Sequence, residues 1–505
     1  MTNNKLILII LLLGIIYKLM MTSGGNFLFN MDNARDLVDV REMVELKKIR
    51  LTGPTSAIEG LFNGPAWYYL LALPYVISSG DPYSTIILQI ILWVIGGFFL
   101  LKLVSKWSKL LILPIGLLWI ASDYISLATV YAFNPNPVTL LTPLLIYLLY
   151  KYLETKKLTY SILTFFLGGL FFNFEMNFGI FIPIIIIVSI LFTRKFTFFK
   201  SKNFWMGSLF FILCLLPQAL FDFRHEFIMT KSVINYLASN EGPSYNLSNR
   251  FQTITQSFFN VFQATLMNHK NFSLIILALF VPILVNFFKH GQKNIIAIIT
   301  LIYIFIPFIL YLIIPVTVNP WHLGGFAAAS ILLIGFLLNS LWSFNFWRKL
   351  IAIILATALI YFSLFNILKF FTQDWGRPNL DPSSYKNEIT AIDYIYKYVN
   401  GQNFKVYTYL PSVYDYPYQY LFWWYGQKKY GYIPYEYAYS ANIPQYISNK
   451  EKFEGSKENY QGLVFLIKEP DRIGYRRAWE DDFDHMEFIS KEMVSPLEVE
   501  VRKEF

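Results

Sequence analysis

The sequence is poor in cysteine, histidine and charged residues. Cys214 is the one cysteine, so an intramolecular disulfide framework and a cysteine-based zinc site are both excluded. Only 15% of the 505 residues are charged, against about a quarter in soluble globular proteins. This shortage excludes a conventional cytosolic enzyme and a disordered chain. The five histidines form no His-x-x-x-His or Glu-x-x-His pattern, and no Walker-type or GxGxxG nucleotide-binding loop is present.

Hydrophobic residues are abundant instead. They make up 55% of the chain, aromatic residues alone make up 19%, and the mean hydropathy is +0.44. Segments apolar enough to cross about 30 Å of hydrocarbon recur up to residue 371. We therefore predict an α-helical polytopic membrane protein with about eleven transmembrane helices. The predicted spans lie at about 5–21, 83–104, 109–121, 138–153, 160–174, 177–193, 204–221, 271–288, 294–315, 323–342 and 350–370.

Lysine and arginine indicate how these helices are oriented, because short cytoplasmic loops are enriched in both residues. Five alternate loops contain nearly all of the short-loop positive charge, whereas loops 122–137, 175–176 and 316–322 contain none. This alternation predicts a retained first span, a cytoplasmic N-terminus and external loops 22–82 and 222–270. A cleaved signal peptide is the less favoured reading of the first span. The charged loops contain Lys102, Lys106 and Lys109; Lys151, Lys156 and Lys157; Arg194, Lys195, Lys200 and Lys202; Lys289 and Lys293; and Arg348 and Lys349.

The formal net charge of +9 follows from this topology. With Lys5, the predicted cytoplasmic side contains 15 basic residues and one acidic residue, Glu154, so everything else is slightly acidic. The positive balance therefore gives no support to a nucleic-acid partner.

Residues 372–505 differ from the rest in composition. They contain 16 Lys or Arg against 20 Asp or Glu and no segment long enough to span a membrane. We predict a transmembrane domain at 1–371 and a small extracytoplasmic α/β domain at 372–505. Within the latter, the residue patterns predict a helix at 389–399 and strands at 405–410 and 462–467.

The first external loop contains the most informative acidic residues. The run Phe29-Asn-Met-Asp32-Asn-Ala-Arg35-Asp36 begins a helical pattern that continues to Arg50. Asp32 and Asp36 are four residues apart and share a helical face, about ten residues beyond the first span. They are either functional acids or carboxylates that merely complement the helix dipole. The apolar run 65–79 follows and is expected to form a short helix in the membrane interface.

Further motifs follow in order along the chain. They are Gly64-Pro65-Ala66-Trp67-Tyr68-Tyr69, Asn134-Pro135-Asn136-Pro137, Phe221-Asp222-Phe223-Arg224-His225 and the aromatic segment from Tyr418 to Trp424. Together with the Asp32–Asp36 segment, they resemble the multi-pass GT-C-type membrane glycosyltransferases. The most similar branch contains the protein O-mannosyltransferases and the bacterial aminoarabinose transferases of lipid A.

The resemblance implies a reaction: an inverting glycosyltransferase moves a sugar from a polyprenyl-phosphate carrier to an acceptor hydroxyl outside the membrane. The acceptor is a lipid, a glycan or a protein. An acid in the first external loop is the family's catalytic base, and Asp32 matches that position. A carboxylate can take the proton that the attacking hydroxyl loses. Relatives often have an Asp-Glu pair where this chain has Asp32-Asn33, so Asp36 and Glu175 are further catalytic candidates.

The remaining candidate residues would bind the phosphate of the sugar donor or another part of the substrates. The leaving phosphate requires a cation, and arginine matches phosphate geometry. Arg224 and His225 follow the seventh predicted span at headgroup depth, and Arg35 and Arg250 are alternatives. Asp123, Asn134 and His322 lie in other external turns and are candidate substrate-binding residues.

No cofactor is expected, and the need for a divalent metal is left open because some GT-C relatives use one. Membrane lipids are expected partners of such a protein. A transporter or flippase of lipid-linked glycans is one rival, but it predicts ionisable residues at mid-bilayer, whereas the acids here gather in external loops. An O-antigen polymerase or ligase is the other rival, and it would need a larger late external loop than 222–270.

Overall fold

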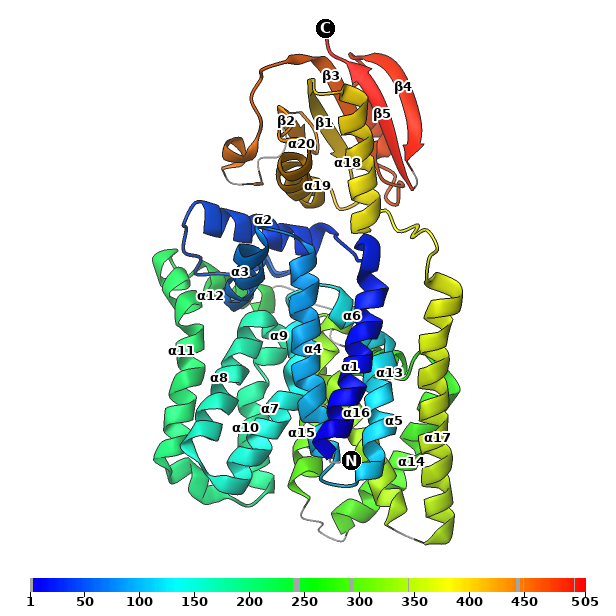
Figure 1. The fold of residues 1–505 in the computed structure, drawn as a ribbon. Coiled ribbons are helices and arrows are strands. Elements are labelled where there is room, and N and C mark those ends of the chain that lie inside the picture. The colour runs from blue at the N-terminus through cyan, green and yellow to red at the C-terminus, as the bar shows by residue number, and fades with distance from the viewer. Residues whose placement is uncertain are drawn as a thin grey trace. The chain divides into compact units, whose positions relative to one another are not determined.

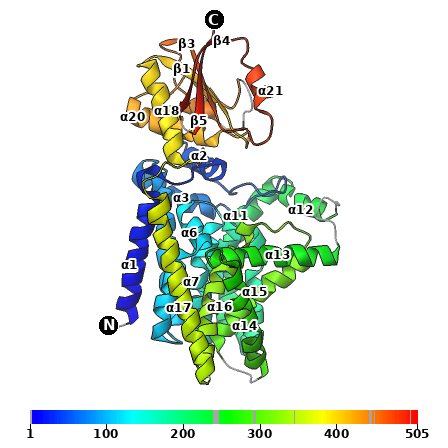
Figure 2. The same cartoon turned by 90° about the vertical axis from the view of Figure 1, so that its right-hand side faces the viewer.

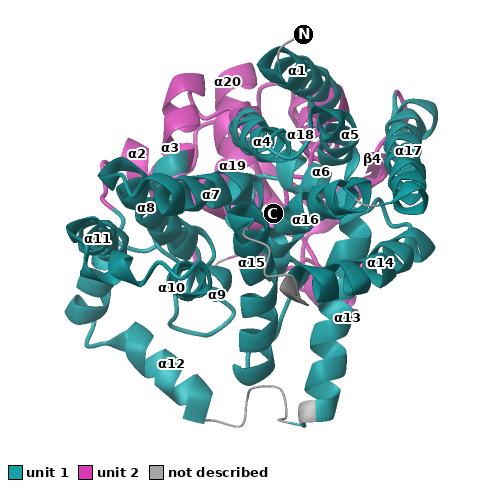
Figure 3. Cartoon of the chain, turned by 90° about the horizontal axis from the view of Figure 1, so that it is seen from below, with its two compact units in different colours: residues 1–19, 50–70, 86–375 teal, residues 20–49, 71–85, 376–505 magenta. Residues whose placement is uncertain are grey.

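The structure is a computed structural model of the 505-residue chain, and it describes residues 3–238, 246–289, 294–343, 345–441, 446–447, 449–494 and 496–505. Lys293, and residues 239–245 of the predicted external loop, lie outside the described residues. The chain forms two compact units (Figure 3). Unit 1 comprises residues 1–19, 50–70 and 86–375, and unit 2 comprises residues 20–49, 71–85 and 376–505.

Unit 1 is helical (Figure 1). Helices α1, α3 and α4 each belong to both units, because a unit boundary falls within them. The helices are α1 (Asn3–Thr22), α3 (Ala66–Ser78), α4 (Tyr83–Val104), α5 (Ile112–Ala121), α6 (Asp123–Val130), α7 (Asn136–Thr155), α8 (Leu158–Phe174), α9 (Met176–Gly179), α10 (Ile182–Phe192), α11 (Lys202–Arg224), α12 (Ile228–Ala238), α13 (Leu247–Thr265), α14 (Lys270–Lys289), α15 (Ile295–Ile313), α16 (Gly324–Trp342) and α17 (Phe346–Lys369). Shorter turns are η2 (Lys109–Leu111), η3 (Phe196–Lys200), η4 (Pro320–Leu323) and the π-helical η5 (Phe370–Asp374).

The described residues contain seven helices that are long and apolar enough to cross a membrane. These are α1, α4, α11, α14, α15, α16 and α17, and α5 with α6 would make an eighth span with a 56° bend. The predicted spans 138–153, 160–174 and 177–193 are helical, but α7, α8 and α10 fall outside this set because of their length or composition. The polytopic helical membrane fold is therefore confirmed, whereas the count of eleven spans is not.

Helix α16 lies at the centre of unit 1, and its spanning window is 94% buried. Small residues at its start make this possible, since they let neighbouring helices approach closely. A Cβ on Gly324 would lie 1.9 Å from the Thr139 hydroxyl oxygen of α7, and one on Gly325 would lie 2.4 Å from the Phe178 ring. The turn before α16 is thereby held beside the starts of α7 and α9, where several candidate residues lie.

Unit 2 contains one mixed sheet and several short helices (Figures 1 and 2). The strand order is β2-β1-β3-β5-β4, with β1 parallel to β2 and β3, and β5 antiparallel to β3 and β4. The strands are β1 (Asn403–Tyr409), β2 (Glu436–Ala438), β3 (Tyr460–Lys468), β4 (Glu487–Val494) and β5 (Leu497–Lys503). The helices and turns are η1 (Ser23–Gly25), α2 (Met31–Glu45), α18 (Tyr385–Val399), α19 (Tyr416–Leu421), the π-helical η6 (Phe422–Gly426), α20 (Gln427–Tyr430), η7 (Lys450–Phe453) and α21 (Arg476–Asp481).

Helices cover both faces of this sheet, because alternate side chains of a strand point to opposite sides. Phe404 of β1 contacts Tyr396 of α18, with ring centroids 5.1 Å apart, whereas Tyr409 contacts Trp479 of α21 at 5.7 Å. The predicted small α/β domain is confirmed, as are its first helix and two of its strands. Helix α2 packs against α19 in the same unit.

Candidate functional site

The first candidate cluster lies at the start of α2, in unit 2. Asn30 precedes the helix, and its side-chain oxygen accepts the backbone N–H of Asp32 at 3.1 Å, which satisfies a helix-terminal donor. This cap places Asp32 in the first turn, where the helix dipole favours a negative charge. The Asp32 side chain is 31% exposed, so its carboxylate can be reached by a substrate. The helix ends at Glu45, five residues earlier than the pattern predicted.

Arg35 joins the two acids of this cluster. Its Nη1 donates to Asp32 Oδ1 at 3.2 Å, while Nε and Nη2 both donate to Asp36 Oδ1, at 3.0 and 2.9 Å. Asp36 is fully buried, so the guanidinium supplies the opposite charge that a buried carboxylate requires. The geometry therefore indicates that Asp36 orients Arg35 and Arg35 orients Asp32. Arg35, which sequence reasoning offered to the donor phosphate, is bound to these two carboxylates.

Arg41 holds α2 against other parts of unit 2, and sequence reasoning missed it. Its side chain is buried, donates through Nη1 to the carbonyl of Gln419 at 3.2 Å, and lies over the Phe453 ring at 3.8 Å. A buried guanidinium with these contacts fixes the helix along its length. The sequence offered no signal for this role, because the partners lie almost 400 residues away.

The second candidate cluster lies in unit 1. Glu175 is buried and caps α9, with Oε1 accepting the backbone N–H and the side-chain amide of Asn177 at 3.0 and 2.9 Å. The same amide lies 3.3 Å from Nε2 of His322, which is also buried. His322 Nδ1 accepts the N–H of Asn319 at 3.3 Å. Two candidate residues, 147 positions apart, are thus joined through Asn177, which sequence reasoning did not single out.

Two more asparagines bring further loops to this cluster. The buried Asn134 donates its amide to the carbonyl of Phe174 at 2.7 Å, next to Glu175. The Asn63 side-chain oxygen accepts the N–H of Met176 at 3.3 Å. Loops 122–137, 175–176 and 316–322, which lack Lys and Arg, therefore meet at one place. Alternating spans place these three loops on the same side of a membrane, so their meeting agrees with the predicted topology.

Asp123 forms a separate polar contact at the break between α5 and α6. Its two oxygens accept the side-chain amides of Asn366, at 2.8 Å, and Asn268, at 2.7 Å. Near it, the fully buried Lys18 donates to the carbonyl of Ile120 at 2.9 Å. Asp123 thus connects α6 to α17 and to the turn after α13, and its carboxylate is already engaged by two amides.

The predicted phosphate-binding cations have different surroundings. Arg224 ends α11, is exposed, and forms no hydrogen bond or ion pair with any described residue. His225 stacks on Phe221 with ring centroids 4.0 Å apart, and its Nδ1 lies 2.8 Å from the Phe221 carbonyl oxygen. Arg250 is buried and donates to the carbonyls of Tyr311 and Val316 at the end of α15. Among the three arginines predicted to bind phosphate, Arg250 therefore caps a helix, Arg35 is bound to two carboxylates, and Arg224 is exposed.

Metal ligands are not grouped in the described parts of the chain. No set of three or more His, Cys, Asp or Glu side chains there could hold a metal ion. The expectation that no cofactor is needed stays a prediction.

The helices of unit 1 and the α/β domain of unit 2 have the GT-C fold of polytopic membrane glycosyltransferases. The chain resembles the crystal structure of ArnT from Cupriavidus metallidurans, a lipid A aminoarabinose transferase, bound to undecaprenyl phosphate. The TM-score is 0.62 at 11% identity, over 98% of this chain and 97% of that one. The apo structure of the same protein gives a TM-score of 0.60 at 12% identity, with the same coverage. No family model and no curated protein sequence matches the chain.

Proposed function

We propose that this protein is an inverting glycosyltransferase that moves a sugar from a polyprenyl-phosphate carrier to an acceptor hydroxyl outside the membrane. The observation that supports it most is the likeness to ArnT over 98% of the chain, since one of those ArnT structures holds undecaprenyl phosphate. At 11% identity this likeness concerns the fold. The argument for the reaction therefore depends on the chemistry of this chain's own residues.

Asp32 would serve as the general base. As the acceptor oxygen attacks the anomeric carbon, the bond between that carbon and the carrier phosphate breaks, and the hydroxyl proton passes to a carboxylate. Asp32 is accessible, and Arg35 holds one of its oxygens at 3.2 Å. Since the acceptor attacks from the face opposite the leaving group, the anomeric configuration inverts.

Arg224 would bind the carrier phosphate, whose negative charge increases as the bond to the sugar breaks. A guanidinium can donate two parallel hydrogen bonds to a phosphate and match its charge. Arg224 is exposed and has no partner among the described residues, so ligand binding would cost it no existing ion pair.

The test is transfer by the purified full-length protein in lipid nanodiscs. A panel of polyprenyl-phosphate sugars is supplied with lipid extract as acceptor, and release of free polyprenyl phosphate is measured. We expect release with at least one donor, and the variant Asp32→Asn should reduce the rate by about 100-fold or more, which is the usual contribution of a general base.

Asp481→Asn is the matched control, because Asp481 is an exposed acid of α21 whose ion pair with Arg477 spans 3.7 Å. It should transfer at the wild-type rate. Wild-type activity in Asp32→Asn would show that the base is another residue. Movement of the lipid-linked sugar across the bilayer without carrier release would show that the protein is a flippase.

A further inference from the structure

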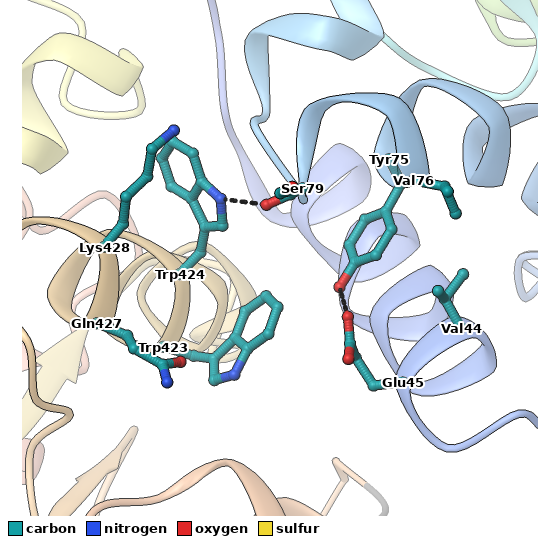
Figure 4. Close-up of a pocket in the computed structure, with 9 residues that line it drawn as sticks. All are labelled: Val44, Glu45, Tyr75, Val76, Ser79, Trp423, Trp424, Gln427 and Lys428. Carbon is teal, nitrogen blue, oxygen red and sulfur yellow. Dashed lines mark hydrogen bonds between the residues drawn. The ribbon is translucent and has the colours of Figure 1, made fainter.

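Unit 2 contains a cavity of about 500 Å³ that the proposed reaction does not use. Three segments line it: the end of α2, the end of α3, and the turn from η6 into α20. Figure 4 shows two indole rings on one side of the space, with an acid, a phenol and two valines on the other. The lining residues are Val44, Glu45, Tyr75, Val76, Ser79, Trp423, Trp424, Gln427 and Lys428.

The π-helical turn η6 places the tryptophans. This wide turn joins α19 to α20 and contains both Trp423 and Trp424. Trp424 is buried and donates its indole N–H to the carbonyl of Ser79 at 2.9 Å. Tyr420 donates to the carbonyl of Gly80 at 2.6 Å. These two bonds fix the helix end to the turn after α3, which gives the pocket a rigid aromatic wall.

The opposite wall presents a positioned carboxylate. Glu45 is exposed, and its Oε1 accepts the hydroxyl of Tyr75 at 2.8 Å. Its second oxygen accepts no hydrogen bond from a described residue, and so it can accept one from a ligand. On the aromatic side, Gln427 is exposed, and the Lys428 ammonium lies 4.5 Å from the centre of the Trp424 ring. Amide, ammonium and carboxylate thus surround an aromatic surface.

These groups together match a sugar. The ring C–H bonds of a pyranose form an apolar, weakly positive face that packs on the negative face of an indole. Trp423 is partly exposed whereas Trp424 is buried, so Trp423 is the indole that a ligand can stack on. Carboxylate and amide groups can hydrogen-bond several hydroxyls at once. The volume lies within the range of about 300–1,000 Å³ that is typical of small-molecule sites.

We infer that this pocket binds a neutral hexopyranose unit of a glycan. Neutrality follows from the lining, since the one acid, Glu45, is matched by the one base, Lys428. Identifying this glycan as the acceptor rests on the proposed function, but the binding of sugar does not. Beside the pocket, Leu73 and Ile77 of α3 are 62% and 85% exposed. Exposed apolar residues of this kind contact lipid, so the sugar can be free in solution or the headgroup of a glycolipid.

The experiment uses the full-length protein in nanodiscs. Saturation-transfer difference NMR is recorded with neutral oligosaccharides, amino sugars and uronic acids, and separately with a neutral glycolipid incorporated into the disc. We expect ring-proton saturation for at least one neutral hexose glycan and markedly less for the charged sugars. A stronger signal from the glycolipid would identify a glycolipid headgroup as the ligand. A stronger signal from the soluble glycan would identify a sugar that is free in solution.

Two variants of different kinds test the site. Glu45→Gln should weaken binding about tenfold, the loss of about 1.4 kcal/mol, and the protein should fold normally because Glu45 is exposed. Trp423→Ala should abolish binding, Trp423→Phe should retain part of it, and Tyr475→Ala should leave it unchanged, since Tyr475 is 64% exposed and does not line the pocket. Wild-type affinity in Glu45→Gln and Trp423→Ala would overturn the inference. So would the absence of saturation with every sugar.

The outcome can be separated from that of the proposed function. Sugar binding without carrier release from any donor would retain the pocket and reject the transferase. Transfer by wild type with an unchanged acceptor KM in Glu45→Gln and Trp423→Ala would retain the transferase and reject the pocket as its acceptor site.

Discussion

At the scale of single residues, the functional hypothesis depends on one carboxylate and the cation beside it. Asp32 and Asp36 are four residues apart and share a predicted helical face, so the sequence does not distinguish them. The structure gives them different surroundings. Asp32 is partly exposed, whereas Asp36 is fully buried and contacts two nitrogens of Arg35. A buried acid cannot reach an acceptor hydroxyl. In the proposed reaction, Asp36 is therefore a positioning residue, and Asp32 is the acid that takes the proton.

This difference predicts unequal effects on transfer. Asp36→Asn removes the charge that orients Arg35, and we expect kcat to fall about tenfold, less than the loss of about 100-fold or more in Asp32→Asn. The KM for the donor should stay unchanged, because neither acid holds the phosphate in our proposal. Steady-state kinetics separates the two constants. Asp36→Glu should recover part of kcat; a general loss of fold would instead lower the amount of active protein without this recovery.

Arg224 gives a prediction about the donor. If its guanidinium binds the carrier phosphate, Arg224→Ala should raise the KM for the polyprenyl-phosphate sugar at least about tenfold, which corresponds to about 1.4 kcal/mol. Arg224→Lys should be intermediate, since lysine keeps the charge without the fork of donors. Arg477→Ala is the control, because the side chain of Arg477 is 91% exposed in α21. An unchanged KM in Arg224→Ala would exclude this residue from the donor site.

At the scale of elements, caps and buried charges determine where helices begin and end. Asn30 caps α2, Glu175 caps α9, and Arg250 binds the last carbonyls of α15. Periodicity predicted the helix of the first external loop, but it extended that helix to Arg50 instead of Glu45. Hydrophobic patterns report which face of a helix is buried and are weak at its ends. The role of Arg250 depends on carbonyls 61 to 66 residues away, which no local pattern reveals.

The start of α18 and the end of β3 contain two buried acids. Glu388 is fully buried, and neither oxygen has a partner among the described residues; Glu469 is 4% exposed. Burial raises the pKa of Glu388 well above its usual value, and Glu469 and Asp381 raise it further. Burial raises the pKa of Glu469 to about 7, which Arg472 partly opposes. Both acids are therefore expected to be protonated below neutral pH.

These shifts predict that unit 2 becomes less stable as the pH rises. An acid whose pKa is higher in the folded state contributes its full stabilisation below the unfolded pKa, which is about 4.3. As the pH rises from that value to the folded pKa, the unfolded chain ionises more readily, and the stabilisation is lost. Thermal unfolding of the full-length protein, followed by tryptophan fluorescence between pH 5 and 9, should show a Tm that falls as the pH rises from 5, with the contribution of Glu469 lost by about pH 7. Glu388→Gln should flatten this slope.

The matched variant for this test is Glu451→Gln, in an exposed part of unit 2, which should keep the wild-type slope. A Tm that rises with pH, or one that is independent of pH in wild type, would contradict the assignment of two buried protonated acids.

At the scale of the whole molecule, the sequence was most informative where one property repeats along the chain. Repeated apolar segments predicted the helical membrane fold, and the change of composition near residue 372 predicted the α/β domain. Alternating loops without Lys or Arg predicted that Asn134, Glu175 and His322 share one side, and hydrogen bonds join the loops that contain them. The cavity in unit 2 could not be predicted, because Glu45, Tyr75 and Trp423 come from three distant segments.

The orientation of the chain is the property on which the proposed chemistry depends most. If the basic loops face the cytoplasm, α2 and the sheet domain are external, where no nucleotide-sugar donor is available and a lipid-phosphate donor is required. Single cysteines test this, since Cys214 is the only native thiol and can be replaced by alanine. In intact cells, a membrane-impermeant maleimide should label Arg477→Cys. It should label Lys106→Cys, at an exposed position after α4, only once the cells are permeabilised. The reverse pattern would place Asp32 on the cytoplasmic side, and transfer to an external acceptor would then be excluded.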